Sequence, residues 1–347
     1  FLFTLQKYLH LLNLFHASLI FKGFPIKKAP RLLKQVEDMN EVDFDAHLQQ
    51  KKRDILDYHL QHNTFYKSLA KNSNIDDWNT IPVMTKRDLQ QPLSERLSSG
   101  FTTSNVYVNK TSGSSGDPFV FAKDKFCHAM TWAIFKEWYG WHDIFNTKQA
   151  RFYGIPFDKK NYRKERFKDW LSNRYRFNVF DLSEQALDTW IAKFSKTDFV
   201  FMTGYRSVIV AFAKHLLTKN IVLTDICPSL KACLPTSEML SDDDKKLLEK
   251  VFNIPIINEY GSAEFGLIAL EKNQQWILNN LNLYVEILDD KGRVLPHGQE
   301  GRIVITDLYN KAHPFIRYEI GDIGSINVID KKTYVLGRYF PKICVDP

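Results

Sequence analysis

The chain contains few cysteines. Four occur among its 347 residues, at Cys127, Cys227, Cys233 and Cys344, and no two of them have the C-x-x-C spacing. So low a count excludes a small scaffold held together by disulfides, and the spacing differs from that of the common zinc modules. We therefore expect reduced thiols and a cytoplasmic protein.

The sequence also lacks a long, uninterrupted apolar run. Its most apolar segment, residues 1–21, is rich in Leu and Phe but is broken by polar residues such as Lys7, His10 and Asn13. A membrane-spanning helix needs about 20 mostly apolar residues, and no small-residue cleavage site indicates a signal peptide. The segment predicts an amphipathic helix that packs on the protein. Because several Lys and Arg residues follow it, a peripheral contact with an anionic membrane is the alternative.

Acidic residues are in the minority, and the net charge is +7. A hydrophobic fraction of 44% excludes a disordered chain. The basic excess favours anionic ligands, but it does not choose between nucleotide, nucleic acid and lipid. The densest basic stretch, residues 158–176, is typical of a solvated helix face. With no recognition motif present, we predict no nucleic-acid partner, and a nucleic-acid-binding module is only a distant alternative.

No G-x-x-x-x-G-K-[ST] motif is present, which excludes the P-loop NTPases. A different loop, residues 111–118, connects two short runs that predict a β-hairpin. Its Gly113 and Gly116 let backbone amides approach an anion without steric conflict. Hydroxyl groups add further donors, at Thr111, Ser112, Ser114 and Ser115. The loop therefore suits phosphate groups, with an ordinary hairpin turn as the alternative.

Two further segments carry isolated acids beside glycines. In residues 258–266, Glu264 offers the hard oxygen ligands that Mg²⁺ prefers, and Tyr260 offers a ring to a purine. In residues 317–322, Asp322 lies in a Gly-Asp turn, where a carboxylate suits the vicinal hydroxyls of a ribose. Each signal is weak alone, since a surface Glu and a turn acid are common. Together, and in this order, they predict a site for a nucleoside triphosphate and Mg²⁺.

The pattern along the chain indicates an α/β fold. Residues 30–72 and 125–141 predict helices, and a further helix is expected to begin at Thr85. Strands expected at 198–202, 230–234 and 254–257 alternate with helices, including one at 241–252, which indicates parallel β-α units with ligands at the carboxyl ends of the strands. From residue 276, short strands such as 283–288 and 301–306 predict a small β-subdomain. We therefore expect residues 1–275 to form a helical N-terminus with an α/β nucleotide-binding core, and residues 276–347 the small β-subdomain.

The order of these motifs resembles that of the adenylate-forming superfamily of acyl-CoA synthetases. Within it, the chain is most similar to the phenylacetate-CoA ligase-like branch, which includes the CapK-type proteins of capsular polysaccharide gene clusters. The resemblance covers almost the whole chain. The matching segments are the loop 111–118, residues 231–240 with Thr236-Ser237-Glu238, the aromatic-Gly-x-x-Glu segment 258–266, the Arg-Tyr-x-x-Gly-Asp segment 317–322, and Gly337-Arg338.

The resemblance implies an AMP-forming ligase that activates a carboxylic acid with ATP and Mg²⁺. It implies the large N-terminal domain of such an enzyme, with mixed β-sheets flanked by helices and a small distal β-subdomain. Catalysis would involve Thr111, Ser114 and Glu264, the last as the metal ligand. The implied nucleotide-binding residues are Thr111, Ser112, Gly113, Ser114, Ser115, Gly116, Ser237, Glu238, Asn258, Tyr260, Gly261, Asp322 and Arg338. The acyl acceptor would be coenzyme A or a sugar or amine, and Tyr205 and the turn 154–157 would line the acid pocket.

The chain departs from the family pattern in three places. Phe119 follows the loop where many relatives carry a lysine, and Tyr339 stands where an acidic hinge residue is usual. The 347 residues also do not contain the small C-terminal domain whose lysine stabilises charge at the α-phosphate. Because the sequence starts with Phe, we expect a piece of a longer protein. A non-catalytic remnant that binds a nucleotide or a protein partner is the alternative.

Overall fold

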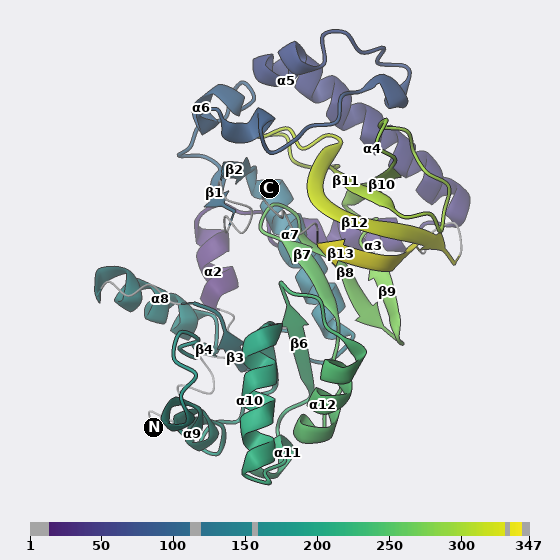
Figure 1. The fold of residues 1–347 in the computed structure, drawn as a ribbon. Coiled ribbons are helices and arrows are strands. Elements are labelled where there is room, and N and C mark those ends of the chain that lie inside the picture. Colours follow the sequence, from purple (N-terminus) through teal and green to yellow (C-terminus); the bar gives the residue numbers. More distant parts are fainter. Residues whose placement is uncertain (1–13, 112–118, 155–158, 330–333, 342–347) are drawn as a thin grey trace. The chain divides into compact units, whose positions relative to one another are not determined.

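The computed structural model describes residues 14–111, 119–154, 159–329 and 334–341; for residues 159, 160, 334 and 337–341 it describes the backbone alone. Two compact units are present (Figure 1). Unit 1 comprises residues 1–22, 135–260 and 270–272, and unit 2 comprises residues 23–134, 261–269 and 273–347. The units therefore do not correspond to a single cut in the sequence, because the chain passes between them several times.

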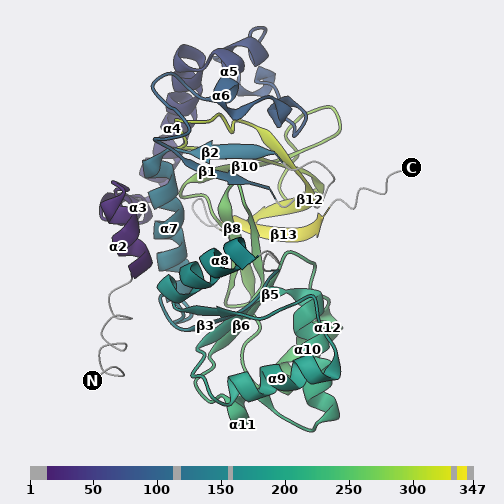
Figure 2. The ribbon, with the colours of Figure 1, turned by 90° about the vertical axis from the view of Figure 1, so that its left-hand side faces the viewer.

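Unit 1 is built on a four-stranded parallel sheet. Its strands, in spatial order, are β4 (Arg174–Arg176), β3 (Gln149–Phe152), β5 (Phe201–Tyr205) and β6 (Ala232–Thr236). Its helices are α2 (Leu14–Phe21), α8 (Lys159–Leu171), α9 (Glu184–Phe194), α10 (Arg206–Thr218), α11 (Leu223–Ile226) and α12 (Asp242–Phe252). In Figure 2, α9, α10 and α12 lie on one side of this sheet and α8 on the other. The predicted parallel β-α units are thus confirmed.

The core of unit 1 is one apolar cluster between the sheet and α9, α10 and α12. Alternation along β3 places Ala150 and Phe152 in this cluster, where the Phe152 ring stacks on Phe177 with centroids 4.8 Å apart. At the start of α12, Ser241 accepts a hydrogen bond from the backbone N–H of Asp244, as its position before a run of acids predicts. The same cap opens α9, at Ser183.

Unit 2 contains most of a seven-stranded sheet, and every named pairing within that sheet is antiparallel. The strands, in spatial order, are β10 (Leu283–Leu288), β11 (Gly301–Asp307), β12 (Tyr318–Val328), β13 (Tyr334–Pro341), β9 (Gln275–Leu278), β8 (Gly266–Lys272) and β7 (Glu259–Ser262). The chain passes between the units within β7 and within β8. A separate hairpin pairs β1 (Tyr107–Lys110) with β2 (Val120–Lys123), as predicted.

Helices make up the rest of unit 2. They are α3 (Lys28–Glu37), α4 (Glu41–His62), α5 (Thr64–Leu69) and α6 (Leu93–Arg96), with short 3₁₀ helices η1 (Trp78–Thr80) and η2 (Asp88–Gln90). The long helix α7 (Lys125–Gly140) begins in unit 2 and ends in unit 1. Asp124 caps its start by accepting from the backbone N–H groups of Phe126 and Cys127. The predicted helices at 30–72 and 125–141 are therefore confirmed.

Two predicted elements differ in the structure. The helix expected from Thr85 is only the 3₁₀ turn η2: the Asp88 carboxylate accepts from both the backbone N–H and the hydroxyl of Thr85, and Pro92 prevents the turn from continuing as a helix. The strand expected at 254–257 is reduced to one parallel bridge between Ile256 and Cys233. Residues 1–13 of the predicted first helix lie outside the described residues. No helix in the part of the chain that the structure describes is long and apolar enough to cross a membrane.

Candidate active site

The predicted phosphate loop is anchored at its base by Thr111. The Thr111 N–H donates to the Phe119 carbonyl at 3.1 Å, and the Thr111 hydroxyl accepts from the Phe119 N–H at 3.1 Å. These two bonds extend the β1–β2 pairing by one residue pair and bring the two ends of the loop together. The other predicted loop residues lie outside the described residues: Ser112, Gly113, Ser114, Ser115 and Gly116.

Glu264 is a buried acid in unit 2. Its residue is 7% exposed, and the Tyr318 hydroxyl donates to Oε1 at 3.5 Å. Burial raises the pKa of the Glu264 carboxyl, while the Ser262 side chain and the positive charges of Lys86 and Lys123 oppose that rise. The carboxylate is therefore held in a poorly solvated place that favours a cation beside it.

Aromatic packing joins three of the motif segments within unit 2. The Tyr318 ring lies 6.1 Å from Phe119 at the end of the loop, 5.9 Å from Phe265 beside Glu264, and 5.3 Å from Phe315. Phe121 of β2 also contacts Phe315, with centroids 6.1 Å apart. The ends of the hairpin loop, the Glu264 segment and the Arg-Tyr segment thus share one cluster of rings. Phe119, which departs from the family pattern, has a packing role here.

Arg317 has a structural role. It is 1% exposed, and one terminal nitrogen, Nη1, donates to the carbonyls of Trp78, Asn79 and Ile81. Its Nε lies 3.4 Å from Oε2 of the buried Glu286. These bonds fix the segment around η1 against the start of β12.

Asp322, the predicted ribose ligand, lies in β12, and its Cα pairs with that of Pro341 in β13.

Gly261 is required by close backbone packing. A Cβ atom added there would lie 2.5 Å from the carbonyl oxygen of Gly266, so a side chain would force β7 and β8 apart. This position fits the predicted motif, in which a glycine precedes the acid.

Arg338 lies in β13, and its side chain is outside the described part of the chain.

The remaining predicted site residues belong to unit 1. Ser237 follows β6 and is exposed, with a left-handed backbone at φ 68°. Glu238 accepts from the backbone N–H and the hydroxyl of Ser207, each at 2.8 Å, and so caps the start of α10. Asn258 donates to Glu271 from both its side chain, at 2.5 Å, and its backbone N–H. Tyr260 is buried.

These contacts give Glu238 and Asn258 structural roles that sequence reasoning missed. The motifs also did not include Lys86 and Lys123, whose positive charges act on the Glu264 carboxyl. Lys123 stands at the end of β2, where it is buried and donates to the Thr131 hydroxyl at 2.9 Å.

The acids of the described residues fit Mg²⁺ only as partners of a phosphate-bearing ligand. Among them, no group of three or more His, Cys, Asp and Glu side chains could hold a metal ion. Mg²⁺ is commonly bound by one or two carboxylates together with substrate phosphates and water. A single buried carboxylate at Glu264 meets that requirement. The three described cysteines, Cys127, Cys227 and Cys233, are buried, form no disulfide and belong to no group of metal-ligating side chains among the described residues. Cys344 lies outside the described residues.

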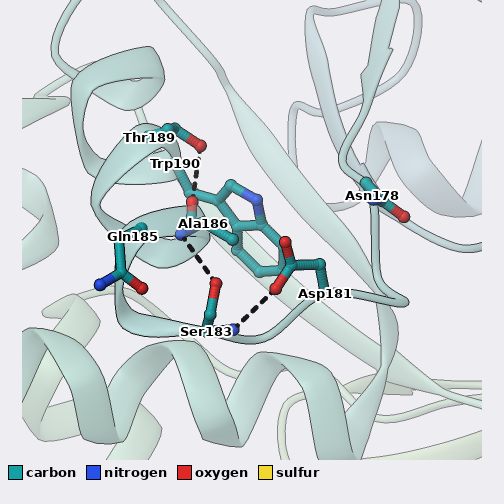
Figure 3. A pocket seen from close by; sticks show the side chains of 7 residues that line it. All are labelled: Asn178, Asp181, Ser183, Gln185, Ala186, Thr189 and Trp190. Atoms are coloured by element: carbon teal, nitrogen blue, oxygen red, sulfur yellow. Dashed lines mark hydrogen bonds between the residues drawn. The ribbon is translucent and has the colours of Figure 1, made fainter.

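A shallow groove of about 370 Å³ lies at the start of α9 in unit 1 (Figure 3). It is lined by Asn178, Asp181, Ser183, Gln185, Ala186, Thr189 and Trp190. Two of its polar groups are used internally, because Asp181 accepts from the Ser183 N–H and the Ser183 hydroxyl accepts from the Ala186 N–H. The groove contains none of the predicted site residues, and we assign it no chemistry.

The sequence was compared with those of known proteins. No family model matches the sequence. Protein CapK of Staphylococcus aureus is 24% identical over 301 residues, which cover 84% of this chain and 64% of CapK. The chain therefore spans less than two thirds of the length of this curated relative.

Two solved structures have a fold similar to that of this chain. A crystal structure of 2-hydroxyisobutyryl-CoA ligase in the postadenylation state, in complex with R3-HIB-AMP, has a TM-score of 0.71 at 16% identity, covering 88% of this chain and 69% of the ligase. An open conformation of the same ligase, in complex with 2-HIB-AMP and CoA, has a TM-score of 0.66 at 16% identity, covering 88% of this chain and 70% of the ligase. The resemblance inferred from the motifs is thus confirmed at the level of the fold, which is that of an adenylate-forming ligase, and the chain is similar in sequence to protein CapK.

Proposed function

We propose that this chain is the nucleotide-binding part of an AMP-forming ligase. In the proposed reaction, a carboxylate oxygen of the substrate acid attacks the α-phosphorus of ATP, and the bond to pyrophosphate breaks. An acceptor then attacks the acyl carbon of the acyl-adenylate, and AMP leaves. The acceptor is coenzyme A by default, with a sugar or amine of capsule or cell-envelope synthesis as the alternative.

One observation carries this proposal above the others. The ends of the hairpin loop, the Glu264 segment and the Arg-Tyr segment are joined by a single cluster of rings, and the Tyr318 hydroxyl reaches Glu264. Three segments that are far apart in the sequence therefore form one structural group. The likeness of fold to a ligase in complex with R3-HIB-AMP supports the same conclusion.

The residues have distinct proposed roles. The loop 111–118 would hold the β- and γ-phosphates, with Thr111 and Ser114 near the reacting groups. Glu264 would bind Mg²⁺, which supplies positive charge where negative charge develops on pyrophosphate. Asp322 would bind the ribose hydroxyls, and Arg338 would lie near ribose or phosphate. In unit 1, Tyr260 would contact the adenine, with Ser237 beside it.

Calorimetric titration of Mg·ATP into the purified chain tests the proposal. We expect binding that Asp322→Ala weakens about tenfold to hundredfold, since hydrogen bonds to a charged group contribute about 1.5–3 kcal/mol each. Asp290→Ala is the matched control, because Asp290 is an exposed turn acid of the same unit. We expect this control to bind as the unmodified chain does.

Absence of Mg·ATP binding by the folded chain would contradict the proposal. The non-catalytic partner-binding remnant would then be the better description. Equal binding by the Asp322→Ala variant would instead remove the ribose role of that residue.

A further inference from the structure

The two faces of the parallel sheet in unit 1 differ in chemistry. One face packs into the apolar cluster, through residues such as Phe152 and Met202. Because strand side chains alternate, Arg151 of β3 and Thr203 of β5 point to the other face, where their Cα atoms are register partners. This pair lies toward the carboxyl ends of the strands, the edge at which ligands bind to open parallel sheets.

Arg151 differs from its two arginine neighbours on this sheet. Arg176, its register partner in β4, pairs with Asp169 and Glu165, each at 3.0 Å. Arg174 pairs with Asp169 at 2.6 Å. Within the described residues, the Arg151 side chain has no ion pair, and its Nε is buried without a hydrogen-bond partner. Such a group is unfavourable unless something else binds it.

The acid whose charge is coupled to that of Arg151 does not meet this need. Glu259 accepts a 2.6 Å hydrogen bond from the Tyr139 hydroxyl and a further one from the Thr236 side chain. Burial raises the pKa of the Glu259 carboxyl, and the positive charge of Arg151 opposes that rise. The two charges therefore influence each other, but they form no ion pair within 4.0 Å. The N–H donors of the Arg151 guanidinium therefore remain available to bind a ligand.

Aromatic rings hold the guanidinium in place. Its central carbon lies 4.5 Å from the centroid of the Tyr153 ring, and Tyr153 in turn contacts Tyr205 at 5.1 Å. A stacked guanidinium keeps its planar donors free at the edge, which is the geometry that binds a carboxylate through two parallel hydrogen bonds. Arg151, Tyr153 and Tyr205 are only partly buried, so part of each side chain is exposed.

We propose that Arg151 binds a carboxylate of the acid substrate and so selects among acids. This inference rests on the proposed ligase function, because that function supplies the acid. The carboxylate is either the one that reacts or a second one on the same acid. The proposal adds a specificity-determining residue that lies in none of the motifs.

The first experiment needs no ligand. We compare the melting temperature of the chain with those of Arg151→Met and Arg176→Met. Met fills a similar volume without charge, so we expect Arg151→Met to melt at the same temperature or higher, because the charge that is removed has no ion pair among the described residues and its buried Nε has no hydrogen-bond partner there. We expect Arg176→Met to melt several degrees lower, because Asp169 and Glu165 lose their partner. A loss of stability in Arg151→Met as large as that in Arg176→Met would make Arg151 a structural residue and overturn the proposal.

The second experiment uses acetate and succinate as probes, at constant ionic strength in chloride, with binding followed by thermal shift. We expect the unmodified chain to be stabilised and Arg151→Met not to be, with partial rescue in Arg151→Lys. Equal effects of the two probes assign Arg151 to the reacting carboxylate, and an effect of succinate alone assigns it to a second one. No stabilisation, or the same stabilisation in Arg151→Met, overturns the proposal.

Calorimetry of Mg·ATP on the same protein separates the two hypotheses. Mg·ATP binding without a carboxylate effect leaves the ligase function standing and removes the role of Arg151. A carboxylate effect that depends on Arg151, without Mg·ATP binding, leaves Arg151 as an anion-binding residue and removes the ligase.

Discussion

The interiors of the two units are built on different principles. Unit 1 is held mainly by one apolar cluster rich in aromatic rings, including Phe152, Phe194 and Phe212, and its buried ion pair between Arg176 and Asp169 lies outside this cluster. Buried charged and polar side chains cross the interior of unit 2, among them Arg317, Glu286 and His59. Apolar neighbours tolerate rearrangement, whereas a buried polar group that loses its partner is strongly destabilising. Unit 2 should therefore be the more fragile unit, and it also carries most of the predicted nucleotide site.

The largest expected effect comes from breaking the buried network of unit 2. Arg317→Ala removes the donors that hold the carbonyls around η1 and leaves the Glu286 carboxylate without its cation, so we expect a loss of about 3–5 kcal/mol. Arg293→Ala is the matched control, since that arginine is 73% exposed and pairs with Asp289 at the surface. Denaturant unfolding followed by hydrogen exchange would locate the loss. A change below about 1 kcal/mol would contradict the structural role of Arg317.

Acid should also weaken unit 2. Burial lowers the pKa of His59 to about 4, and the imidazole lies 2.8 Å from the Asn310 carbonyl and 3.2 Å from the Ser98 hydroxyl. The unfolded chain takes up this proton near pH 6.5 and the folded chain only near pH 4. Stability from this group is thus complete above pH 6.5 and is lost as the pH falls toward 4, by about 3 kcal/mol in all.

The acid prediction is measured as the free energy of unfolding against pH. In His59→Gln, a neutral amide replaces the imidazole, so we expect lower stability at neutral pH but a shallower decline below pH 6.5. An unchanged slope would show that His59 is not the group responsible.

The smallest expected effect lies in the apolar core of unit 1. Phe212→Leu exchanges one apolar side chain for another among rings such as Trp190 and Phe194, and no polar group loses a partner. We expect a loss of about 1 kcal/mol, with Mg·ATP binding unchanged. A loss equal to that of Arg317→Ala would remove the contrast between the two units.

Much of the fold follows from local patterns in the sequence. The helices between residues 30 and 72 have regular apolar spacing, and Ser241, which is followed by acidic residues, predicts the start of α12. Strand bounds were less predictable: β5 and β6 begin at Phe201 and Ala232, later than expected, because register is set by pairing with neighbouring strands rather than by local residues.

The candidate site was predictable only as a set of motifs. Sequence order predicts Glu264 and Asp322 as site residues, whereas the capping role of Glu238 depends on Ser207, 31 residues away. In the part of the chain that the structure describes, Arg151 has no ion pair because Glu165 and Asp169 of α8 pair with the arginines of β4. No local sequence pattern predicts that arrangement. Residues whose role is set by distant partners are therefore those that sequence reasoning misses.

The long separations within unit 2 also bear on how the protein is made. His59 bonds to the carbonyl of Asn310 across 251 positions, and Arg317 bonds to the carbonyl of Ile81 across 236. Contacts so distant in sequence close large loops and slow folding. During synthesis, α4 and its neighbours emerge long before the strands that complete their surroundings, and meanwhile they expose apolar surface. Unit 2 should therefore depend on chaperones during translation more than the contiguous β-α segments of unit 1 do.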